Sequence, residues 1–348
     1  MPNRDLVIHH NDADGYCSAG LISLLNRRLN RDMPLYYCAK YGIEPQIIDE
    51  LDKLMKESET EKVDTIYILD FSFQADILAQ IAEKLRPAKI VYLDHHATAV
   101  NEMAKWSDTK RIYADGFWTA HIKRIGGEPV ECFTANNNKE CGASLTLKHV
   151  RYRCHELRQN HNIEYVVSQC KDYDLWIQKY KNSMPFVTGI SADMPHPEVW
   201  RKVLTSEKLW QKYAAMGTGI LKQQIALAKQ ILRNPENMEI KAINGCKVLV
   251  LNLNPQWVNL VSHTIVENSD IDAVISYSIN GLKNVAVSIR SAERWNKQCG
   301  EFMKKHIAGG GHRHAAGGRS VSFNEFCKTL GYAEKPAVET ERNRTLEL

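Results

Sequence analysis

The sequence lacks any apolar run approaching the roughly 18 residues that a membrane-spanning helix requires, so we expect no membrane segment. Its start lacks a basic segment followed by an apolar stretch, so we expect no secretory signal and a cytoplasmic location. The nine cysteines never form a Cys-x-x-Cys pair. This scattered pattern favours reduced thiols over a disulfide framework.

An excess of charge of one sign is also absent. The chain has 45 Lys and Arg residues against 41 Asp and Glu residues, a formal net charge of +4. So small an excess permits an anionic substrate but does not indicate a broad nucleic-acid surface. Hydrophobic residues make up 44% of the 348 residues, which is enough to bury the cores of about two domains.

The first half of the chain alternates between short apolar runs, rich in Val, Ile and Tyr, and segments with helical spacing. This alternation predicts an α/β fold, a doubly wound parallel sheet covered by helices on both faces. We expect strands at Leu6–His9, Leu35–Ala39, Thr65–Leu69, Lys89–Leu93 and Arg111–Tyr113. We expect helices at about Cys17–Leu29, Pro45–Lys56 and Gln74–Leu85, and a helical region at Cys141–Trp176.

The second half has a different pattern. The run Glu198–Leu232 predicts a long helical connection, interrupted near Gly217 and Gly219. Beyond it, "IKAINGCKVLVLNL" and "VISYSINGLKNVAVSIRS" each hold an Asn-Gly pair between strand-like runs, which predicts two hairpins. We therefore expect a first domain at 1–195, a helical linker at 196–237, a smaller α+β domain at 238–332 and a polar, poorly ordered tail at 333–348.

Histidines and carboxylates follow three of the predicted strands. They are His9, His10, Asp12 and Asp14 after the first strand, Asp70 in "YILDFSF", and Asp94, His95 and His96 in "VYLDHHAT". A later helical segment, "CKDYDLW", adds Asp172 and Asp174. Because ligands bind outside the carboxyl ends of strands in such sheets, we expect these side chains to meet at one edge.

Such a cluster of carboxylates is tolerable only if cations neutralise it. Mixed imidazole and carboxylate ligands favour Mn2+, with Co2+, Fe2+ or Mg2+ as alternatives. The number of ligands predicts two metals, about 3.5–4 Å apart, bridged by a central carboxylate. Taken alone, each residue has an ordinary explanation, because an Asp after a strand, such as Asp70 or Asp94, commonly caps a helix. The coincidence at successive strand ends favours the metal site.

In this order, "HNDADG", "ILDFS", "LDHH" and "KDYD" resemble the four motifs of the DHH phosphoesterase superfamily. Downstream, "GGGHRHAAGG" resembles the signature of the DHH-associated C-terminal domain. The resemblance covers about Leu6–Phe323. It implies the two-domain layout above, with the metals in the first domain and the substrate-binding residues in the second.

The resemblance also implies a role for each motif residue. It makes His10, Asp12, Asp14, Asp70 and His95 metal ligands, with Asp70 bridging both metals. It gives Asp94 the role of orienting the cluster and turns His96 towards the substrate phosphate, so that Asp70, Asp94, His95 and His96 form the catalytic set. His9 remains a competitor of His10. Either Asp172 or Asp174 supplies the last ligand, and Asp172 is favoured.

In the C-terminal domain, the resemblance assigns substrate binding to Arg290 and to Gly309, Gly310, Gly311 and His312. Successive glycines let backbone N–H groups approach a phosphate, and His312 can add a donor. Arg290, near the end of a predicted strand, can clamp a phosphate with two hydrogen bonds. A flexible glycine loop and a solvated arginine are the alternatives.

Within the superfamily, the compact layout resembles the nanoRNases of the NrnA and NrnB types. The residues within the motifs are more similar to the NrnB type. This implies a metal-dependent phosphodiesterase, an oligoribonuclease that hydrolyses short RNA or dinucleotides with a water activated by two metals. Its substrates would extend to 3′-phosphoadenosine 5′-phosphate or cyclic dinucleotides. The alternatives are a RecJ-like single-strand exonuclease and a non-catalytic nucleotide-binding sensor. The resemblance leaves monomer and homodimer open.

Overall fold

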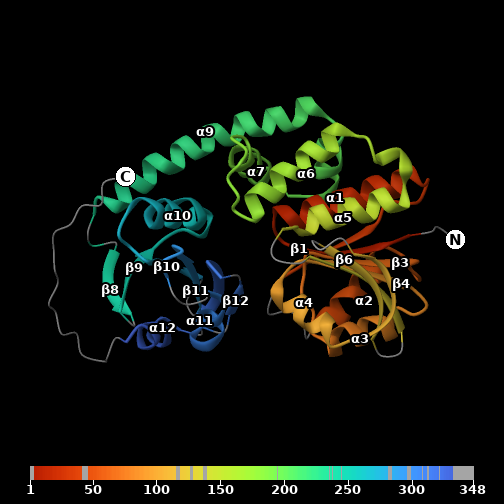
Figure 1. The fold of residues 1–348 in the computed structure, drawn as a ribbon, viewed down its shortest axis with the longest axis horizontal. Coiled ribbons are helices and arrows are strands. Elements are labelled where there is room, and N and C mark those ends of the chain that lie inside the picture. The colour runs from red at the N-terminus through yellow and green to blue at the C-terminus, as the bar shows by residue number, and fades with distance from the viewer. Residues whose placement is uncertain are drawn as a thin grey trace. The chain divides into compact units, whose positions relative to one another are not determined.

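The computed structural model describes residues 4–40, 46–114, 118–125, 128–135, 139–193, 195–234, 236, 238–243, 245–280, 284–295, 299–307, 309–311, 313–320 and 322–331. The chain divides into two compact units, Met1–Ile220 and Leu221–Leu348, and the division falls inside helix α9 (Glu207–Leu232) (Figure 1). The finer boundaries at 195 and 237 stay predictions. The expected polar tail lies outside the described residues.

A seven-stranded sheet, in the order β2-β1-β3-β4-β7-β6-β5, forms the centre of the first unit. Its strands are β1 (Leu6–His10), β2 (Leu35–Ala39), β3 (Thr65–Leu69), β4 (Lys89–Asp94), β5 (Ser107–Ala114), β6 (Trp118–Ile125) and β7 (Glu128–Ala135). The first five strands in the spatial order run parallel, and β6 and β5 are antiparallel at one edge. The predicted α/β fold with a parallel sheet is confirmed.

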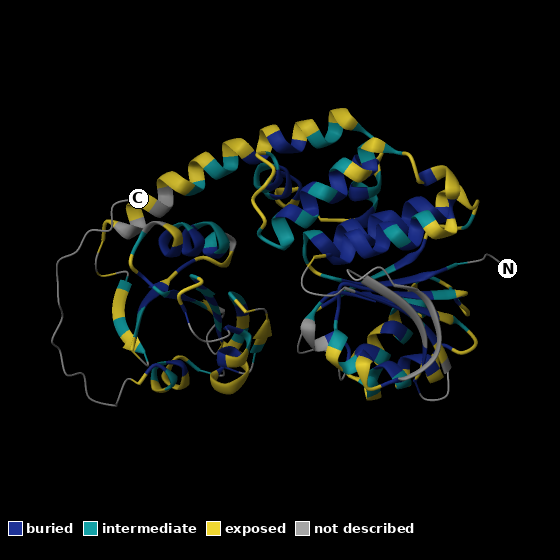
Figure 2. Cartoon of the chain, in the orientation of Figure 1, coloured by how far each residue is buried: buried dark blue, intermediate teal, exposed yellow. Residues whose placement is uncertain are grey.

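Helices cover both faces of this sheet (Figure 1). The helices of this unit are α1 (Ala13–Arg28), α2 (Ile47–Glu57), α3 (Ala75–Lys84), α4 (Ala97–Ala104), α5 (Gly142–Arg153), α6 (His161–Asp174), α7 (Ser183–Ala192) and α8 (Pro197–Leu204). Helices α1 and α5 pack on one face of the sheet and α2 and α3 on the other, while α6 and α8 pack on α1, and α7 packs on α6. Along β1, Val7 packs into the core under α1 and α5, whereas Leu6 and Ile8 pack into the core on the face of α2 and α3. The first three residues of β1, Leu6–Ile8, are all apolar because both faces of the strand are buried there (Figure 2).

The predicted strand at Arg111–Tyr113 needs a correction, because it belongs to β5, an antiparallel strand at the edge of the sheet. The prediction also missed its neighbours β6 and β7. Residues 118–123 alternate between apolar and polar side chains, and the Gly-Gly pair at 126–127 was a further hairpin signal.

The predicted interruption near Gly217 and Gly219 is also wrong, because α9 is continuous from Glu207 to Leu232. Gly217 instead allows α9 to pack closely on α7, since a Cβ atom at this position would lie 1.8 Å from the carbonyl oxygen of Pro185 in α7. Even with the 26 residues of α9 included, none of the helices in the described part of the chain has the length and apolar character needed to cross a membrane.

The second unit is built on a six-stranded sheet in the order β12-β13-β11-β10-β9-β8. Its elements are β8 (Met238–Ile243), β9 (Cys246–Asn252), α10 (Val258–Asn268), β10 (Ala273–Asn280), β11 (Asn284–Ser291), α11 (Cys299–His306), β12 (Gly309–Gly311), β13 (Ala315–Ser320) and α12 (Phe323–Thr329). The pairs β8–β9 and β10–β11 are antiparallel, as the two Asn-Gly hairpins predict. Apolar side chains of α10 pack on one face of the sheet, and those of α11 and α12 pack on the other.

Candidate metal centre

The three motif segments of the first unit follow strands that are neighbours in the sheet, because β3 pairs with both β1 and β4. All three strands are parallel, so their carboxyl ends lie at one edge. His10 is the last residue of β1, Asp70 follows β3 directly, and Asp94 is the last residue of β4. The topology therefore brings together the side chains that the sequence pattern singled out.

Asp70 lies at the centre of this group. Its φ of 56° is a left-handed conformation that is uncommon for a non-glycine residue, and its N–H donates to Leu93 O at 2.8 Å. The bend directs the side chain into a buried position with 1% exposure. Within the described part of the chain, no group donates a hydrogen bond to either carboxylate oxygen. Two buried carboxylate oxygens in this condition are suited to binding a cation.

Imidazoles approach Asp70 from two sides. His95 Nε2 lies 3.2 Å from Asp70 Oδ1, and His10 Nδ1 lies 3.8 Å from Asp70 Oδ2. Two groups of potential metal-binding atoms, each within 4.8 Å, share this residue, and they are Asp70–His95–His96 and His10–Asp12–Asp70. This sharing is the geometry that a bridging carboxylate requires.

Asp14 is held by the start of helix α5. Its oxygens accept hydrogen bonds from the N–H groups of Gly142 at 2.5 Å and Ala143 at 2.8 Å. These are free N–H groups of a first helical turn, and the helix dipole favours a negative charge there. Asp14 Oδ2 also lies 3.8 Å from His95 Nε2, so the helix terminus positions a carboxylate at the cluster.

Asp94 and His96 form a pair beside the cluster. His96 Nδ1 lies 2.7 Å from Asp94 Oδ1, and the Ser72 hydroxyl donates to the other Asp94 oxygen at 3.0 Å. Both Asp94 oxygens are therefore occupied by neighbours. This arrangement agrees with the expected orienting role of Asp94, because the carboxylate fixes the His96 ring.

The electrostatics of the cluster follow from burial and crowding. Burial raises the pKa of Asp70 well above its usual range, and the charges of Asp14 and Asp12 raise it further. Asp174 has a raised pKa for the same reasons. Burial lowers the pKa of His96, but the Asp94 carboxylate more than offsets this, and the resulting pKa is about 9. Without added positive charge, the carboxylates cannot all be ionised at neutral pH.

The donor set fits divalent cations. Carboxylate and imidazole ligands together suit Mn2+ and neighbouring transition metals, and two overlapping groups of ligands allow two ions. The side chains placed to hold them are His10, Asp12, Asp14, Asp70, His95 and Asp174. His96 is near enough to Asp70, at 3.7 Å, to face either a metal or a substrate.

The geometry of the site bears on two pairs of alternatives that the sequence left open, Asp172 or Asp174 and His9 or His10. Asp172, the favoured ligand of the fourth motif, does not face the cluster, whereas Asp174 Oδ2 lies 3.5 Å from His95 Nε2. The Asp172 carboxylate instead accepts three hydrogen bonds from the segment after α6, from Lys179 N at 2.7 Å, Tyr180 N at 3.2 Å and Ser183 Oγ at 2.6 Å. Residues two apart on a helix point about 200° apart, so only one of these two carboxylates can face His95, and in this structure it is Asp174.

His9, the competitor of His10, also lies outside the cluster. Its Nδ1 is 2.8 Å from His10 O, and its ring packs on Tyr16 with a centroid distance of 4.7 Å. Successive residues of a strand point to opposite faces, so only one of the two histidines can turn towards Asp70. In this structure it is His10.

The sequence pattern placed Cys141 only at the start of a predicted helical region and did not assign it to the cluster. The structure adds a different observation, because the thiol, Asp14 and Asp174 place one potential ligand atom each within 4.8 Å of one another. Cys141 is fully buried, and burial raises the pKa of its thiol well above the usual range. The signal for this placement was the small-residue segment "CGAS" at a predicted helix start.

In the second unit, Arg290 is half-buried in β11 and makes intramolecular contacts. Its Nη2 and Nε donate to Asn259 Oδ1 at 2.5 and 3.1 Å. Gly309–Gly311 form strand β12, paired with β13, so the alternative of a flexible glycine loop is wrong. His312 lies outside the described residues. The substrate-binding roles of this group stay predictions.

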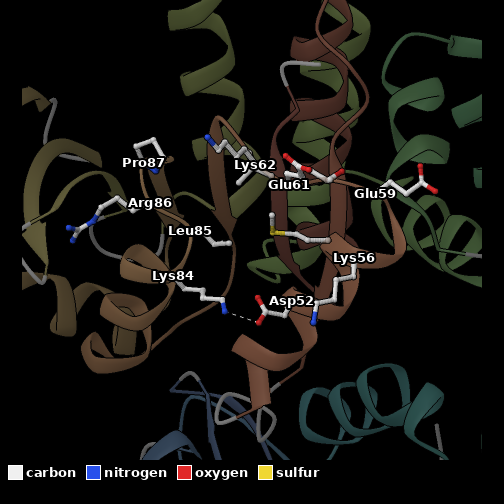
Figure 3. Close-up of a pocket in the computed structure, with 12 residues that line it drawn as sticks. Asp52, Lys56, Glu59, Glu61, Lys62, Lys84, Leu85, Arg86 and Pro87 are labelled. Carbon is white, nitrogen blue, oxygen red and sulfur yellow. Dashed lines mark ion pairs between the residues drawn. The ribbon is translucent and has the colours of Figure 1, made fainter. Parts of the chain in front are cut away.

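A cavity of about 610 Å³ lies elsewhere in the first unit (Figure 3). Its lining includes Lys62 and Val63, shortly before β3, and Arg86 and Pro87, shortly before β4, so it belongs to the amino ends of these strands. Figure 3 shows the ion pair between Asp52 and Lys84 in its wall, at 2.8 Å. None of the clustered histidines and carboxylates lines it.

The fold and the cluster together define an α/β protein with a candidate two-metal centre at the carboxyl edge of its sheet. The chain is similar to RecJ from Thermus thermophilus in complex with Mn2+, with 14% identity, a TM-score of 0.56, and coverage of 94% of this chain and 51% of that one. The chain therefore spans about half the length of that protein.

A second similar structure is exonuclease RecJ bound to manganese, with 14% identity, a TM-score of 0.51, and coverage of 96% of this chain and 91% of that one. A pGpG-specific phosphodiesterase from Vibrio cholerae has 11% identity and a TM-score of 0.46, with coverage of 94% and 96%. No family model and no curated protein matches the sequence. At these identities the RecJ structures show a shared fold, which agrees with the fold that the DHH resemblance implies.

Proposed function

We propose that this chain is a divalent-metal-dependent phosphodiesterase that hydrolyses short RNA oligonucleotides and dinucleotides. The observation that supports it is the central position of Asp70, a buried carboxylate that is shared by two potential ligand groups and accepts no hydrogen bond from the residues that the structure describes. The RecJ fold and the motif pattern point to the same chemistry. We propose Mn2+ as the metal because nitrogen and oxygen ligands are mixed.

In this proposal, different side chains bind the metals, bind the substrate phosphate and position the phosphate-binding histidine. His10, Asp12, Asp14, Asp70, His95 and Asp174 hold two cations. When bound there, the cations supply Lewis-acid stabilisation of the phosphoryl group and a nucleophilic water at neutral pH. His96, with a pKa of about 9, is protonated at neutral pH and donates a hydrogen bond to a phosphate oxygen. Asp94 keeps the His96 ring in position.

We propose a short substrate because the charge of the chain is nearly balanced. A long single strand is bound through a basic groove with stacking platforms along it, and a formal net charge of +4 gives little support for such a groove. Arg290 and the glycines at 309–311 are proposed to bind a further phosphate in the second unit. The second candidate function is a RecJ-like exonuclease on longer strands, which the fold favours equally.

A turnover assay with Mn2+ tests the proposal. The panel contains a labelled RNA dinucleotide, a long single-stranded RNA, 3′-phosphoadenosine 5′-phosphate and cyclic dinucleotides, with Asp70→Asn as the blank. Rapid conversion of the dinucleotide and slow conversion of the long strand are expected. Processive degradation of the long strand favours the exonuclease, and binding without turnover favours a nucleotide sensor. Activity that persists after chelation contradicts the metal mechanism.

A further inference from the structure

A fully buried thiol lies against the metal cluster. The Cys141 sulfur, one Asp14 oxygen and one Asp174 oxygen lie within 4.8 Å of one another. The same spacing holds for the atoms in each of the two ligand groups that share Asp70. The sulfur is therefore near enough to contact a cation that Asp14 and Asp174 bind.

His95 joins this third group to Asp70. Its Nε2 lies 3.8 Å from Asp14 Oδ2, 3.5 Å from Asp174 Oδ2 and 3.2 Å from Asp70 Oδ1. Among the described residues, none donates a hydrogen bond to Asp174 Oδ2 or to either oxygen of Asp70, which is 1% exposed. Buried oxygens in this condition are suited to a cation. The thiol thus belongs to the same centre and not to a separate site.

The backbone around the thiol is fixed in place. Cys141 N donates to Ser144 Oγ at 2.9 Å. The preceding residue, Glu140, is buried, and its carboxylate lies 3.0 Å from the Nζ atom of Lys171 in the last turn of α6. This ion pair links the start of α5 to the turn that carries Asp174. The sulfur and the Asp174 carboxylate are therefore held together by the fold itself, as a preorganised ligand set requires.

Helix capping does not by itself explain a cysteine at this position. Cys141 is the N-cap residue of α5 and forms a capping box with Ser144. Ser, Thr, Asp and Asn are preferred there, because their side-chain oxygens accept hydrogen bonds and sulfur is a weak acceptor. A buried thiol can also act as a small apolar side chain, but two neighbouring carboxylates do not suit that role. Affinity for transition metals is what sulfur offers here and oxygen does not.

We propose that the Cys141 thiolate is a ligand of the cation bound by Asp14 and Asp174, and that it sets the metal preference of this position. The bound cation displaces the thiol proton to solvent, as it does at other cysteine ligands. Thiolate favours Zn2+, Fe2+ and Co2+ over Mg2+ and Mn2+. Mn2+ stays the proposed ion on the other side of Asp70. This inference rests on the proposed function, because it takes the cluster as a two-metal centre.

Absorption spectroscopy with Co2+ tests the ligand directly. The full chain is freed of metal with a chelator, dialysed, and titrated with Co2+ without oxygen or substrate. Thiolate bound to Co2+ gives a charge-transfer band in the near ultraviolet, which carboxylate and imidazole ligands do not give. We expect the wild type to show this band and Cys141→Ser to lose it, with the visible bands of bound Co2+ retained. Serine is a favoured N-cap residue, so α5 should stay intact in this variant.

Cys170→Ala is the matched control. This second thiol is also fully buried and lies 3.7 Å from Asp14 Oδ1, but it is not a member of the ligand group. The variant should keep the band. Competition titrations give a second readout, the ratio of Zn2+ affinity to Mn2+ affinity. Cys141→Ser should lower this ratio at least about tenfold, since losing even a residue that only orients a ligand costs about 10–100-fold in metal affinity. Cys170→Ala should leave the ratio unchanged.

Each outcome bears on one of the two proposals. A wild type that binds no Co2+, or binds it without the band, overturns the sulfur ligand. A band that Cys141→Ser retains, or that only Cys170→Ala loses, overturns it as well. The spectrum needs no substrate, so the proposed function is tested separately. A band in the wild type without turnover of any dinucleotide in Mn2+ retains the ligand and overturns the proposed function. Turnover without the band does the reverse.

Discussion

Gly142 lies directly against Asp70. A Cβ atom at position 142 would come within 2.6 Å of the Asp70 Cβ atom and 2.8 Å of Asp14 Oδ2. The glycine thus lets the start of α5 approach the cluster closely enough to donate two N–H groups to Asp14. A small residue remote in sequence from the strand-end motifs is therefore part of the geometry of the site.

Gly142→Ala should displace the Asp14 and Asp70 carboxylates. We expect a loss of about 1–3 kcal/mol in the free energy of unfolding, because the added methyl group overpacks a buried site. Metal binding, measured by calorimetry, should weaken strongly. The matched control is Gly219→Ala, at an exposed position of α9 where a Cβ atom meets nothing within 4 Å. It should stabilise the helix by about 0.5–1 kcal/mol and leave metal binding intact.

Asp70→Asn should abolish stoichiometric metal binding and turnover together. The substitution keeps the shape of the side chain but removes the charge that two ligand groups share. The metal-free variant should unfold at a higher temperature than the metal-free wild type, because a buried carboxylate crowded by others is replaced by a neutral amide. Metal content by elemental analysis and thermal unfolding after chelation measure the two effects. Near-normal metal content would contradict the central role of Asp70.

Asp172→Asn and Asp174→Asn should have opposite effects. The Asp172 carboxylate accepts hydrogen bonds from Lys179 N and Ser183 Oγ, in the segment after α6. Its substitution should therefore lower the free energy of unfolding by about 1–3 kcal/mol and leave the metal stoichiometry unchanged. Asp174 faces His95, so its substitution should reduce metal binding without destabilising the metal-free chain. Paired measurements of unfolding and metal content on both variants decide the assignment. Metal loss in the Asp172 variant alone would restore the ligand favoured from the sequence.

The stabilisation that Mn2+ confers should increase with pH. The pKa values of Asp14, Asp70 and Asp174 are raised in the folded, metal-free chain, so ionising them above about pH 4 reduces its stability. The pKa of His96 is raised to about 9, so its stabilising charge is present below about pH 6.5 and is lost as the pH rises through 9. Metal binding displaces the protons of the three carboxylates and is therefore favoured by higher pH.

The difference in unfolding temperature with and without Mn2+ is the quantity to follow between pH 5 and pH 8. We expect this difference to widen with rising pH. Buried histidines outside the cluster, such as His149 with a pKa lowered to about 3, stabilise the fold as the pH rises to about 6.5. Their contribution is the same with and without metal and cancels in the difference. A constant difference would contradict the assignment of the raised carboxylates to the metal site.

Much of the candidate site could be predicted from local sequence. The strands Leu35–Ala39 and Thr65–Leu69 were located to the residue, because short apolar runs bounded by polar segments are a clear strand signal. The interior strands β6 and β7 were missed, because they carry no continuous apolar run. The continuity of α9 through Gly217 was missed because a glycine in a helix can serve close packing on another helix, and that neighbour is not visible in the sequence.

By itself, the sequence determined the fold class and the set of residues able to bind metals, since the order of strands and the residues at their ends are local properties of the chain. The tertiary structure decided between His9 and His10 and between Asp172 and Asp174, because both choices depend on the direction of a side chain relative to Asp70. It also decided the roles of Gly142 and Cys141, which depend on how closely α5 approaches the sheet. Distances between remote segments are set by packing, and a linear pattern does not encode them.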